Sequence, residues 1–284
     1  MGVERTDCAS DPRLAVYRDV ADRGLLLERG LFIAEGRLVV KRVIDNPRYR
    51  LQSLLVNDAA LHDLAPAIER LDVSVPVLVC RTDDFLTVTG FHIHRGCLAL
   101  VERPAAASVE QIVESAHTLV VLEAVANADN VGGVFRNAAA FGADGVLLSP
   151  TCCDPLYRKA IRTSMGAALT VGFARVDPHD WPAVLTRVRA SGMTIVALTP
   201  REPSEPLDEF AARWGQAGFR TGSDAGPTRS RRRLALVVGA EGSGLSPAVE
   251  RAADHRVRIP ISDRVDSLNL SVAAGIALQR LMSG

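Results

Sequence analysis

The stretch TLVVLEAVANADNVGGVFRNAAAFGADGVLLS (118–149) decides the fold class of this 284-residue chain. Its first part, TLVVLEAV (118–125), is a continuous apolar run, which is typical of a strand that is covered on both faces of a sheet. The apolar spacing then predicts a helix from about Val131 to Phe141, and GVLLS (145–149) predicts the next strand. A strand, a helix and a strand in this order indicate the parallel sheet of an α/β protein.

The alternation of strands and helices continues to the end of the chain. We expect helices over 156–164, 180–190 and 267–282, a short helix over 207–214, and strands near 169–175 and over 193–199, 234–239 and 255–261. These elements predict a mainly parallel sheet with helices on both faces.

Residues 201–233 interrupt this alternation. The run GQAGFRTGSDAGPTRSRRR is rich in Gly, Ser, Thr and Arg, which predicts a mobile loop. It ends in a basic cluster of Arg229, Arg231, Arg232 and Arg233. We expect a solvated charge run here, and a specific nucleic-acid contact is the alternative.

Residues 13–103 predict a separate small α/β unit. The segment LFIAEGRLVVKRVI (31–44) begins like a strand and becomes an apolar-periodic helix. Further strands are predicted by LQSLLVN (51–57), VPVLVC (75–80) and CLALVERP (97–104). PAAASVEQ (104–111) is small and polar, which predicts a linker. We therefore expect two domains, 1–105 and 106–284.

Composition excludes several classes of protein. No apolar run is long enough to span a bilayer, and the start MGVERTDCASDPR lacks the apolar part of a secretory signal, so we expect a cytoplasmic protein. With 33 basic and 33 acidic residues, the chain does not bind nucleic acid by overall charge, although a local basic face stays possible. Five cysteines without a CxxC pair fit neither a disulfide framework nor a zinc site, so we expect reduced, mostly structural cysteines and no metal.

The first segment that can carry chemistry is NADNVGGVFRNAAAFGADG (127–145), which begins where a buried strand ends. Asn127 or Asn130 can cap the helix that follows, and Gly132 and Gly133 would let a ligand approach the backbone closely. Arg136 lies near the helix start and could hold a phosphate or orient a hydroxyl. A capped helix with a surface arginine is the alternative.

The second segment is LALVVGAEGSGLSP (234–247), in which a strand runs into a turn with three glycines around Glu241. The spacing is neither a Walker loop nor GxGxxG. A glycine-rich turn at the carboxyl end of a parallel strand is nevertheless where α/β proteins place ligands. Glu241 disfavours a phosphate and suits hydroxyl, amino or cationic groups. The alternative is a turn that needs glycine only for its dihedral angles.

The third segment is HRVRIPISDRVDSLNLSVAAGIALQRL (255–281). A strand ends at Ile259-Pro260-Ile261, a polar loop follows, and Ser267-Leu268-Asn269 opens an apolar helix. We expect Ser267 to be a simple N-cap, whereas Asn269 can hydrogen-bond a ligand.

In their order and wording, the three segments resemble the SpoU/TrmH branch of the SPOUT RNA methyltransferases. That family carries N…NxG…R…FG, GxEGxGL and IP…SLNxSxA, which stand here as NADNVGGVFRNAAAFG, GAEGSGLS and IPISDRVDSLNLSVA. DPLYRKAIRTSMGA (154–167) is also similar, and the resemblance covers roughly 118–282. Through LFIAEGRLVV and RGCLALVERP, the first unit resembles the L30e-like substrate-binding domain often attached to this family. Asn137 stands where the family commonly has Thr.

The resemblance implies a SPOUT-type α/β domain with a C-terminal trefoil knot, preceded by an L30e-like domain, and a homodimer with the active site near its interface. It implies S-adenosylmethionine (SAM) as the cofactor. The cofactor positions that the resemblance transfers are Gly239, Ile259 and Leu268, with Gly242 and Leu236 beside them. The catalytic and RNA-facing positions that it transfers are Asn130, Arg136, Glu241, Ser267 and Asn269.

The reaction that the resemblance implies is methylation of a ribose 2′-hydroxyl in structured RNA, with ribosomal RNA as the first choice of substrate and transfer RNA as the second. Family proposals make the residue matching Arg136 the base, but arginine keeps its proton in proteins. We expect Arg136 to bind the RNA phosphate and to hydrogen-bond the nascent alkoxide, and the base to be an RNA phosphate oxygen or water. The alternatives are an inactive RNA-binding paralogue and a Rossmann oxidoreductase, against which the missing GxGxxG counts.

Two further expectations concern Gly239 and the first unit. Gly239→Val should fill the adenine pocket and leave the fold intact. The first unit should bind RNA through two groups of basic and aromatic side chains, Arg48, Tyr49 and Arg50 in one and His92, His94 and Arg95 in the other. A chain starting near Ser108 should therefore keep SAM binding and dimerisation but lose most of its RNA affinity and activity.

Overall fold

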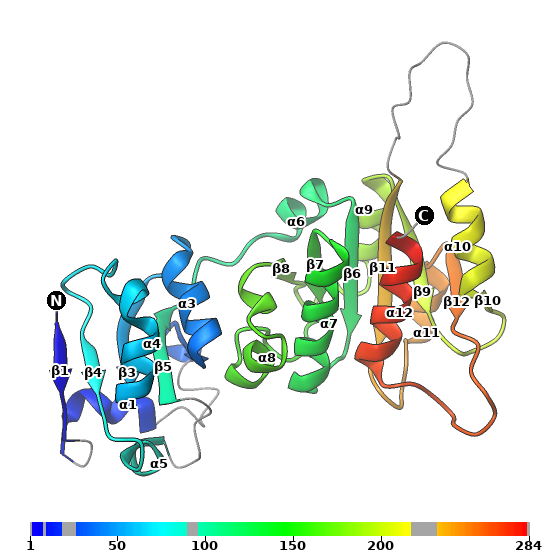
Figure 1. Ribbon diagram of the computed structural model, residues 1–284. Helices are drawn as coiled ribbons and strands as arrows, with labels where there is room; N and C mark the ends of the chain where they lie inside the picture. Colours follow the sequence, from blue (N-terminus) through cyan, green and yellow to red (C-terminus); the bar gives the residue numbers. More distant parts are fainter. Residues whose placement is uncertain (1, 8–9, 19–26, 90–95, 217–231, 283–284) are drawn as a thin grey trace. The chain divides into compact units, whose positions relative to one another are not determined.

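The computed structural model describes residues 2–7, 10–18, 27–89, 96–216 and 232–282 (Figure 1). The chain forms two compact units. The first unit contains Met1–Ala105 and Pro155–Leu169, and the second contains Ala106–Asp154 and Thr170–Gly284. The predictions made for His92, His94 and Arg95, for Arg229 and Arg231, and for residues 217–231 of the predicted loop lie outside the described residues, whereas the ends of that loop belong to α10 and β11.

The first unit is built on a mixed five-stranded sheet with the strand order β1-β4-β3-β5-β2. Its strands are β1 (Val3–Arg5), β2 (Leu31–Glu35), β3 (Leu51–Val56), β4 (Val77–Val79) and β5 (Cys97–Glu102). Its helices are η1 (Pro12–Leu14), α1 (Ala15–Arg18), α3 (Arg37–Asp45), α4 (Asp58–Ile68), α5 (Asp84–Thr89), α8 (Arg158–Thr163) and η4 (Ala167–Leu169). The strand-like start of 31–44, the helix that follows it, and the strands predicted over 51–57, 75–80 and 97–104 are confirmed, whereas the short strand β1 was not predicted.

The segment Pro155–Leu169 belongs to the first unit although it lies between two strands of the second. The guanidinium of Arg158 forms an ion pair with Glu35, whose side chain is only 1% exposed at the end of β2. Arg42 donates a hydrogen bond to the carbonyl oxygen of Met165 at 2.8 Å. A buried carboxylate needs a partner, so the first unit depends on this distant segment.

Tyr49 corrects one prediction about RNA binding. Its ring is 8% exposed and meets the ring of Phe32 edge to face, with 5.7 Å between the centroids. Its hydroxyl donates to the carbonyl oxygen of Leu169 at 2.8 Å. The prediction that Tyr49 stacks on an unpaired base is therefore wrong, because the ring is part of the packing of the first unit. Its neighbours Arg48 and Arg50 are exposed.

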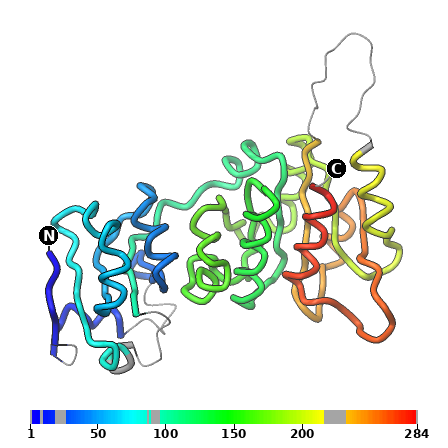
Figure 2. The backbone as a smooth tube through the Cα atoms, viewed as in Figure 1, coloured from blue at the N-terminus to red at the C-terminus, as the bar shows by residue number. Residues whose placement is uncertain are grey.

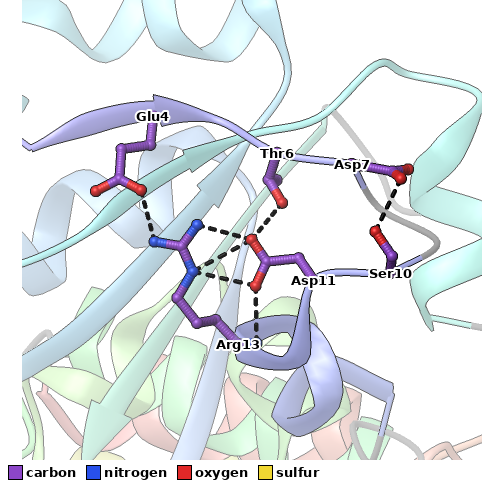
Figure 3. A network of polar contacts seen from close by, with 6 residues as sticks. All are labelled: Glu4, Thr6, Asp7, Ser10, Asp11 and Arg13. Atoms are coloured by element: carbon purple, nitrogen blue, oxygen red, sulfur yellow. Dashed lines mark hydrogen bonds and ion pairs between the residues drawn. The ribbon is translucent and has the colours of Figure 1, made fainter.

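Within the first unit, a polar network joins the segment around β1 to η1 (Figure 3). The Asp11 carboxylate caps η1 and accepts hydrogen bonds from Arg13 and from the hydroxyl of Thr6, at 2.7 and 2.5 Å. Arg13 also forms an ion pair with Glu4 at 2.6 Å. The Arg13 guanidinium and the Thr6 hydroxyl hold the pKa of Asp11 well below its usual range.

The cysteines only partly follow the sequence-based prediction. Cys97, Cys152 and Cys153 are free and buried. Cys80, by contrast, takes part in a disulfide, so the prediction of five reduced cysteines is wrong. Spacing along the chain does not show which thiols folding brings together.

The second unit is a parallel seven-stranded sheet with the order β10-β12-β9-β11-β6-β7-β8. Its strands are β6 (Thr118–Glu123), β7 (Gly145–Leu148), β8 (Gly172–Arg175), β9 (Met193–Leu198), β10 (Glu205–Pro206), β11 (Arg233–Gly239) and β12 (His255–Arg258). Its helices are α6 (Val109–Ser115), α7 (Ala128–Phe141), α9 (Val184–Ala190), α10 (Leu207–Gln216), α11 (Pro247–Ala252) and α12 (Leu270–Met282). The predicted α/β class and parallel sheet are confirmed.

Helices cover both faces of this sheet (Figure 1). On one face, α6, α9 and α11 bury Ile112, Val188 and Val249 against the strands. On the other, α7 and α12 run side by side although they come from opposite ends of the unit (Figure 2). The central strands are buried on both sides, which explains their continuous apolar runs.

Three sequence-based predictions in this unit are corrected. Residues 104–111 are not only a linker, because Ser108 and Gln111 form a capping box that starts α6. The last helix begins at Leu270, not at 267. Arg233 is not a solvated charge, because its guanidinium donates to the carbonyl oxygens of Ala116 and Ser191.

Candidate functional site

The carboxyl ends of four neighbouring strands lie level at one edge of the second unit's sheet. Gly239 at the end of β11 is in register with Glu123 at the end of β6, and Leu198 at the end of β9 is in register with Val238 and Val257. The segments that follow these strands therefore gather at one edge. This is the edge where open parallel sheets bind ligands.

The turn after β11 needs its glycines. A side chain at Gly239 would place its Cβ 2.4 Å from the carbonyl carbon of Gly244, and the turn is closed by a bridge between Ala240 and Gly244. Gly242 and Gly244 have φ angles of +82° and +67°, which only glycine adopts without strain. The prediction that Gly239→Val leaves the fold intact is therefore wrong, because the new side chain would strike the backbone of its own turn.

Asn269 joins the three sequence segments into one site. Its side-chain nitrogen donates to Asn130 Oδ1 and to Glu241 Oε1, both at 3.0 Å. Its side-chain oxygen accepts from the backbone N–H groups of Ser271 and Val272, at 3.0 and 3.3 Å. Because both ends of the amide have fixed partners, its orientation is defined.

The cap predicted for the last helix is wrong, whereas one of the two candidates for α7 is confirmed. Asn269, not Ser267, caps α12, and Asn127, not Asn130, caps α7 by accepting from the N–H of Asp129 at 2.8 Å. Asn130 is buried, with its side-chain oxygen engaged by Asn269. Ser267 is exposed, and its side chain forms no hydrogen bond within the described ranges. Asn130, Glu241 and Asn269 therefore meet, and Ser267 does not join them.

Gly133 serves helix packing. A Cβ at this position would lie 2.5 Å from the Cβ of Ser271, so the missing side chain lets α7 and α12 approach closely. Asn137 strengthens the same contact by donating to the carbonyl oxygen of Ser271 at 2.6 Å, while a Cβ at Gly275 would lie 2.9 Å from the Asn137 amide. The expectation that Gly133 gives room to a ligand is replaced by this packing role.

Arg136 lies on the exposed side of α7, two turns from the helix start. Its guanidinium forms no hydrogen bond or ion pair with any residue that the structure describes. An arginine without a partner among the described residues can take a phosphate or another anion in its planar fork of donors.

The remaining positions differ in what they offer a ligand. Gly242 is exposed, and Ile259 and Leu268 are half-buried. Leu236 is fully buried within β11, so its side chain presents no surface to a ligand. Among the described residues, no group of three His, Cys, Asp or Glu side chains could hold a metal ion, and no described helix is long and apolar enough to cross a bilayer.

Two residues at this edge were not predicted from the sequence. Glu123 is buried at the end of β6, where it accepts hydrogen bonds from the N–H of Ser246 at 2.8 Å and from the indole of Trp181 at 3.3 Å. Arg201, after β9, donates to two carbonyl oxygens of the glycine turn. A charged residue that ends an apolar strand was a visible signal for Glu123, whereas nothing in the sequence singled out Arg201.

Fold and site define a parallel α/β protein in which polar residues from three separate segments meet beyond the ends of β6, β11 and β12. Residues 117–279 match the family model described as the SpoU rRNA Methylase family. An uncharacterized tRNA/rRNA methyltransferase of Mycobacterium bovis is 40% identical over 279 residues, covering 96% of this chain and 90% of the relative. The chain therefore belongs to the SpoU rRNA methylase family, as its motifs predict.

Solved structures show the same fold over nearly the whole chain. An AdoMet-bound rRNA methyltransferase from Sinorhizobium meliloti superposes with a TM-score of 0.77 at 24% identity, covering 99% of this chain and 98% of that one. The SpoU methyltransferase AviRb from Streptomyces viridochromogenes gives 0.75 at 20% identity, covering 96% and 97%. At these identities the likeness concerns the fold.

Proposed function

We propose that this chain transfers the methyl group of SAM to a ribose 2′-hydroxyl in structured RNA, with ribosomal RNA as the first substrate to test and transfer RNA as the second. The observation that carries the proposal is that hydrogen bonds connect Asn130, Glu241 and Asn269 at the edge of the sheet. These residues come from three separate segments of the family match. The reaction belongs in the cytoplasm.

The cofactor is S-adenosylmethionine, and the edge after β11 and β12 fits it. The exposed backbone at Gly242 offers amide and carbonyl groups to an adenine edge, and the half-buried Ile259 and Leu268 offer apolar contact. When bound, SAM supplies a methyl group on a positively charged sulfonium. The Glu241 carboxylate suits a cationic ligand, and its hydrogen bond to Asn269 keeps it at this edge. Gly239 offers backbone groups to the cofactor, and the buried side chain of Leu236 packs in the core beneath the site.

Arg136 is the residue that acts on the RNA. Its exposed guanidinium binds the phosphate beside the target nucleotide and donates to the 2′-oxygen as negative charge develops there. Because arginine keeps its proton, the hydroxyl proton passes to an RNA phosphate oxygen or to water. Holding the 2′-oxygen in line with the methyl group supplies a large part of the rate enhancement.

The architecture is part of the same proposal. We assign the second unit as a knotted SPOUT domain and the first as an L30e-like RNA-binding domain. The order of β12, β9 and β11 supports the knot, because the chain must return past β9 from β12 to reach α12 beside α7. Exposed Arg48 and Arg50 support RNA binding by the first unit.

A homodimer through the second unit completes the proposal. Apolar side chains are exposed on the segment before α12 and on its first turn: Ile261 is 40% exposed, Val265 52% and Val272 50%. A second copy of the chain would cover this surface.

The proposal is tested by titrating the purified chain with SAM in a calorimeter and by mapping ribose methylation in total RNA from cells with and without the gene. We expect SAM binding and at least one 2′-O-methylated position that disappears with the gene. Arg136→Ala should keep SAM affinity and lower methylation by ~100-fold or more, the usual scale for losing a transition-state donor. Arg251→Ala, an exposed arginine on α11, is the matched control and should change neither. SAM binding without any lost methylation site would instead indicate a non-catalytic RNA-binding protein.

A further inference from the structure

The glycine turn after β11 is held by a side chain from the segment that follows the neighbouring strand β9. Arg201 follows β9 and reaches across the edge of the sheet. Its Nη1 donates to the carbonyl oxygen of Leu245 at 2.8 Å, and its Nη2 donates to the carbonyl oxygen of Ser243 at 2.6 Å. One guanidinium therefore fixes two backbone carbonyls on either side of Gly244.

Arg201 is itself fixed in this position. Its Nη1 lies 3.6 Å from Glu250 Oε1, and that oxygen also accepts a hydrogen bond from the hydroxyl of Thr199 at 2.9 Å. The backbone N–H of Arg201 donates to the same Thr199 hydroxyl oxygen at 3.2 Å. The carboxylate of Glu250 is largely buried, with 11% of its side chain exposed. A planar guanidinium with partners on several of its donors has one orientation.

The opposite end of the turn is held from the other neighbour of β11. Glu123, at the end of β6, accepts the hydrogen bond of the Ser246 N–H, and Ser246 caps α11. One charged side chain thus reaches the turn from each side of β11: Glu123 from the end of β6, and Arg201 from the segment after β9. Each of these contacts joins groups of the protein itself, so they favour the formed turn independently of any contact with a ligand. A preformed loop binds more tightly than one that must become ordered on binding.

We propose that Arg201 is a positioning residue for SAM: it keeps the turn from Ala240 to Leu245 formed, so that the backbone at Gly242 is ready to receive the cofactor. The inference rests on the proposed function, because it assigns SAM to this turn. Arg201 does not need to touch the cofactor, since its guanidinium is engaged by carbonyl oxygens of the protein.

The variant that tests this is Arg201→Met, which keeps the unbranched apolar stem of the side chain and removes its donors. We expect the dissociation constant for SAM to rise by ~10-fold or more in calorimetry, which corresponds to about 1.4 kcal/mol. Without SAM, the backbone amides from Gly242 to Leu245 should exchange hydrogen faster than in the unchanged chain. Arg201→Lys, which can engage one carbonyl at a time, should fall between the two.

Arg189→Met is a matched control within the second unit. Arg189 also binds a carboxylate and a backbone carbonyl oxygen, those of Asp254 and Ala252, and its side chain is 44% exposed against 48% for Arg201. It lies on α9, so its loss should lower thermal stability to a similar degree and leave SAM affinity unchanged. A purely structural role of Arg201 would make the two variants alike in both measurements.

The outcomes separate the inference from the proposed function. If the unchanged chain binds SAM and Arg201→Met binds it equally well, or if the turn exchanges no faster, the positioning role is overturned and the proposed function stands. If the unchanged chain itself does not bind SAM, the proposed function fails, and this inference fails with it.

Discussion

The close approach of α7 and α12 predicts an unusual result for the substitution Gly133→Ala. In a helix interior, alanine is more favourable than glycine by roughly 0.5–1 kcal/mol. Here, however, the new Cβ would lie 2.5 Å from the Cβ of Ser271, whereas carbon atoms in contact prefer about 3.5–4.0 Å. The clash involves a carbon fixed to the helix backbone, so α12 must move by about 1 Å, at the cost of roughly 1–3 kcal/mol that overpacking usually carries. We expect a net loss of stability.

The sign of this effect should depend on Ser271. In a Ser271→Gly background the clashing atoms are gone, so Gly133→Ala should stabilise the protein by its helix propensity alone. Urea unfolding of the four chains in this double-mutant cycle should give a coupling free energy of at least about 1 kcal/mol. Equal effects of Gly133→Ala in both backgrounds would show that the helices adjust freely, and the packing argument would be refuted. Loss of SAM affinity in the single variant, with recovery in the double one, would show that the shift reaches Asn269.

Three further predictions concern other parts of the chain. Asn269→Asp keeps the helix cap, but it removes both side-chain donors and places a second carboxylate beside Glu241. We expect a nearly unchanged free energy of unfolding and a ~100-fold loss of methylation. Retained methylation would contradict the proposed site. Burial raises the pKa of Cys97 from 9.0 to about 12, so its contribution to stability is complete below pH 9 and is lost as pH rises toward 12. The urea midpoint should therefore fall more between pH 8.5 and 10.5 than it does for Cys97→Ala, and an equal fall would contradict the assignment. A chain starting at Ser108 lacks the part of the first unit against which residues 155–169 pack. Proteases should therefore cut residues 155–169 in the shortened chain and spare them in the full chain. Equal resistance of this segment to proteolysis in both chains would count against the division into units.

Much of the fold could be predicted because burial leaves a direct record in the sequence. The apolar runs at 118–125 and 234–239 mark strands covered on both faces, and both are strands in the structure. The start of α6 could have been found as well, since Ser108 and Gln111 have the spacing of a capping box. The small, polar composition of residues 104–111 favoured a linker, and the capping-box spacing was overlooked.

The sequence predicts which residues of each motif belong to the site, but it does not show how the three segments contact one another. The motifs singled out Asn130, Glu241 and Asn269, and the structure brings these three together. They did not show that Asn269 is the residue that connects the other two, because a side chain's partners come from distant parts of the chain.

Other roles depended on neighbours that the sequence does not place. The roles of Gly133 and Tyr49 were misjudged because each is decided by a residue more than a hundred positions away, Ser271 and Leu169. Arg201 carried no local signal at all, since an arginine after a strand is ordinarily a surface residue.

The place of residues 155–169 in the first unit has a consequence for synthesis on the ribosome. Glu35 precedes its partner Arg158 by 123 residues. At about 5–20 residues per second, roughly 6 to 25 s separate the emergence of the two side chains. During this interval the first unit lacks the Arg158 guanidinium that pairs with the buried carboxylate of Glu35. A nascent chain that pauses before residue 158 therefore exposes an incomplete first unit to chaperones and proteases, and its folding is completed only while the second unit is already being made.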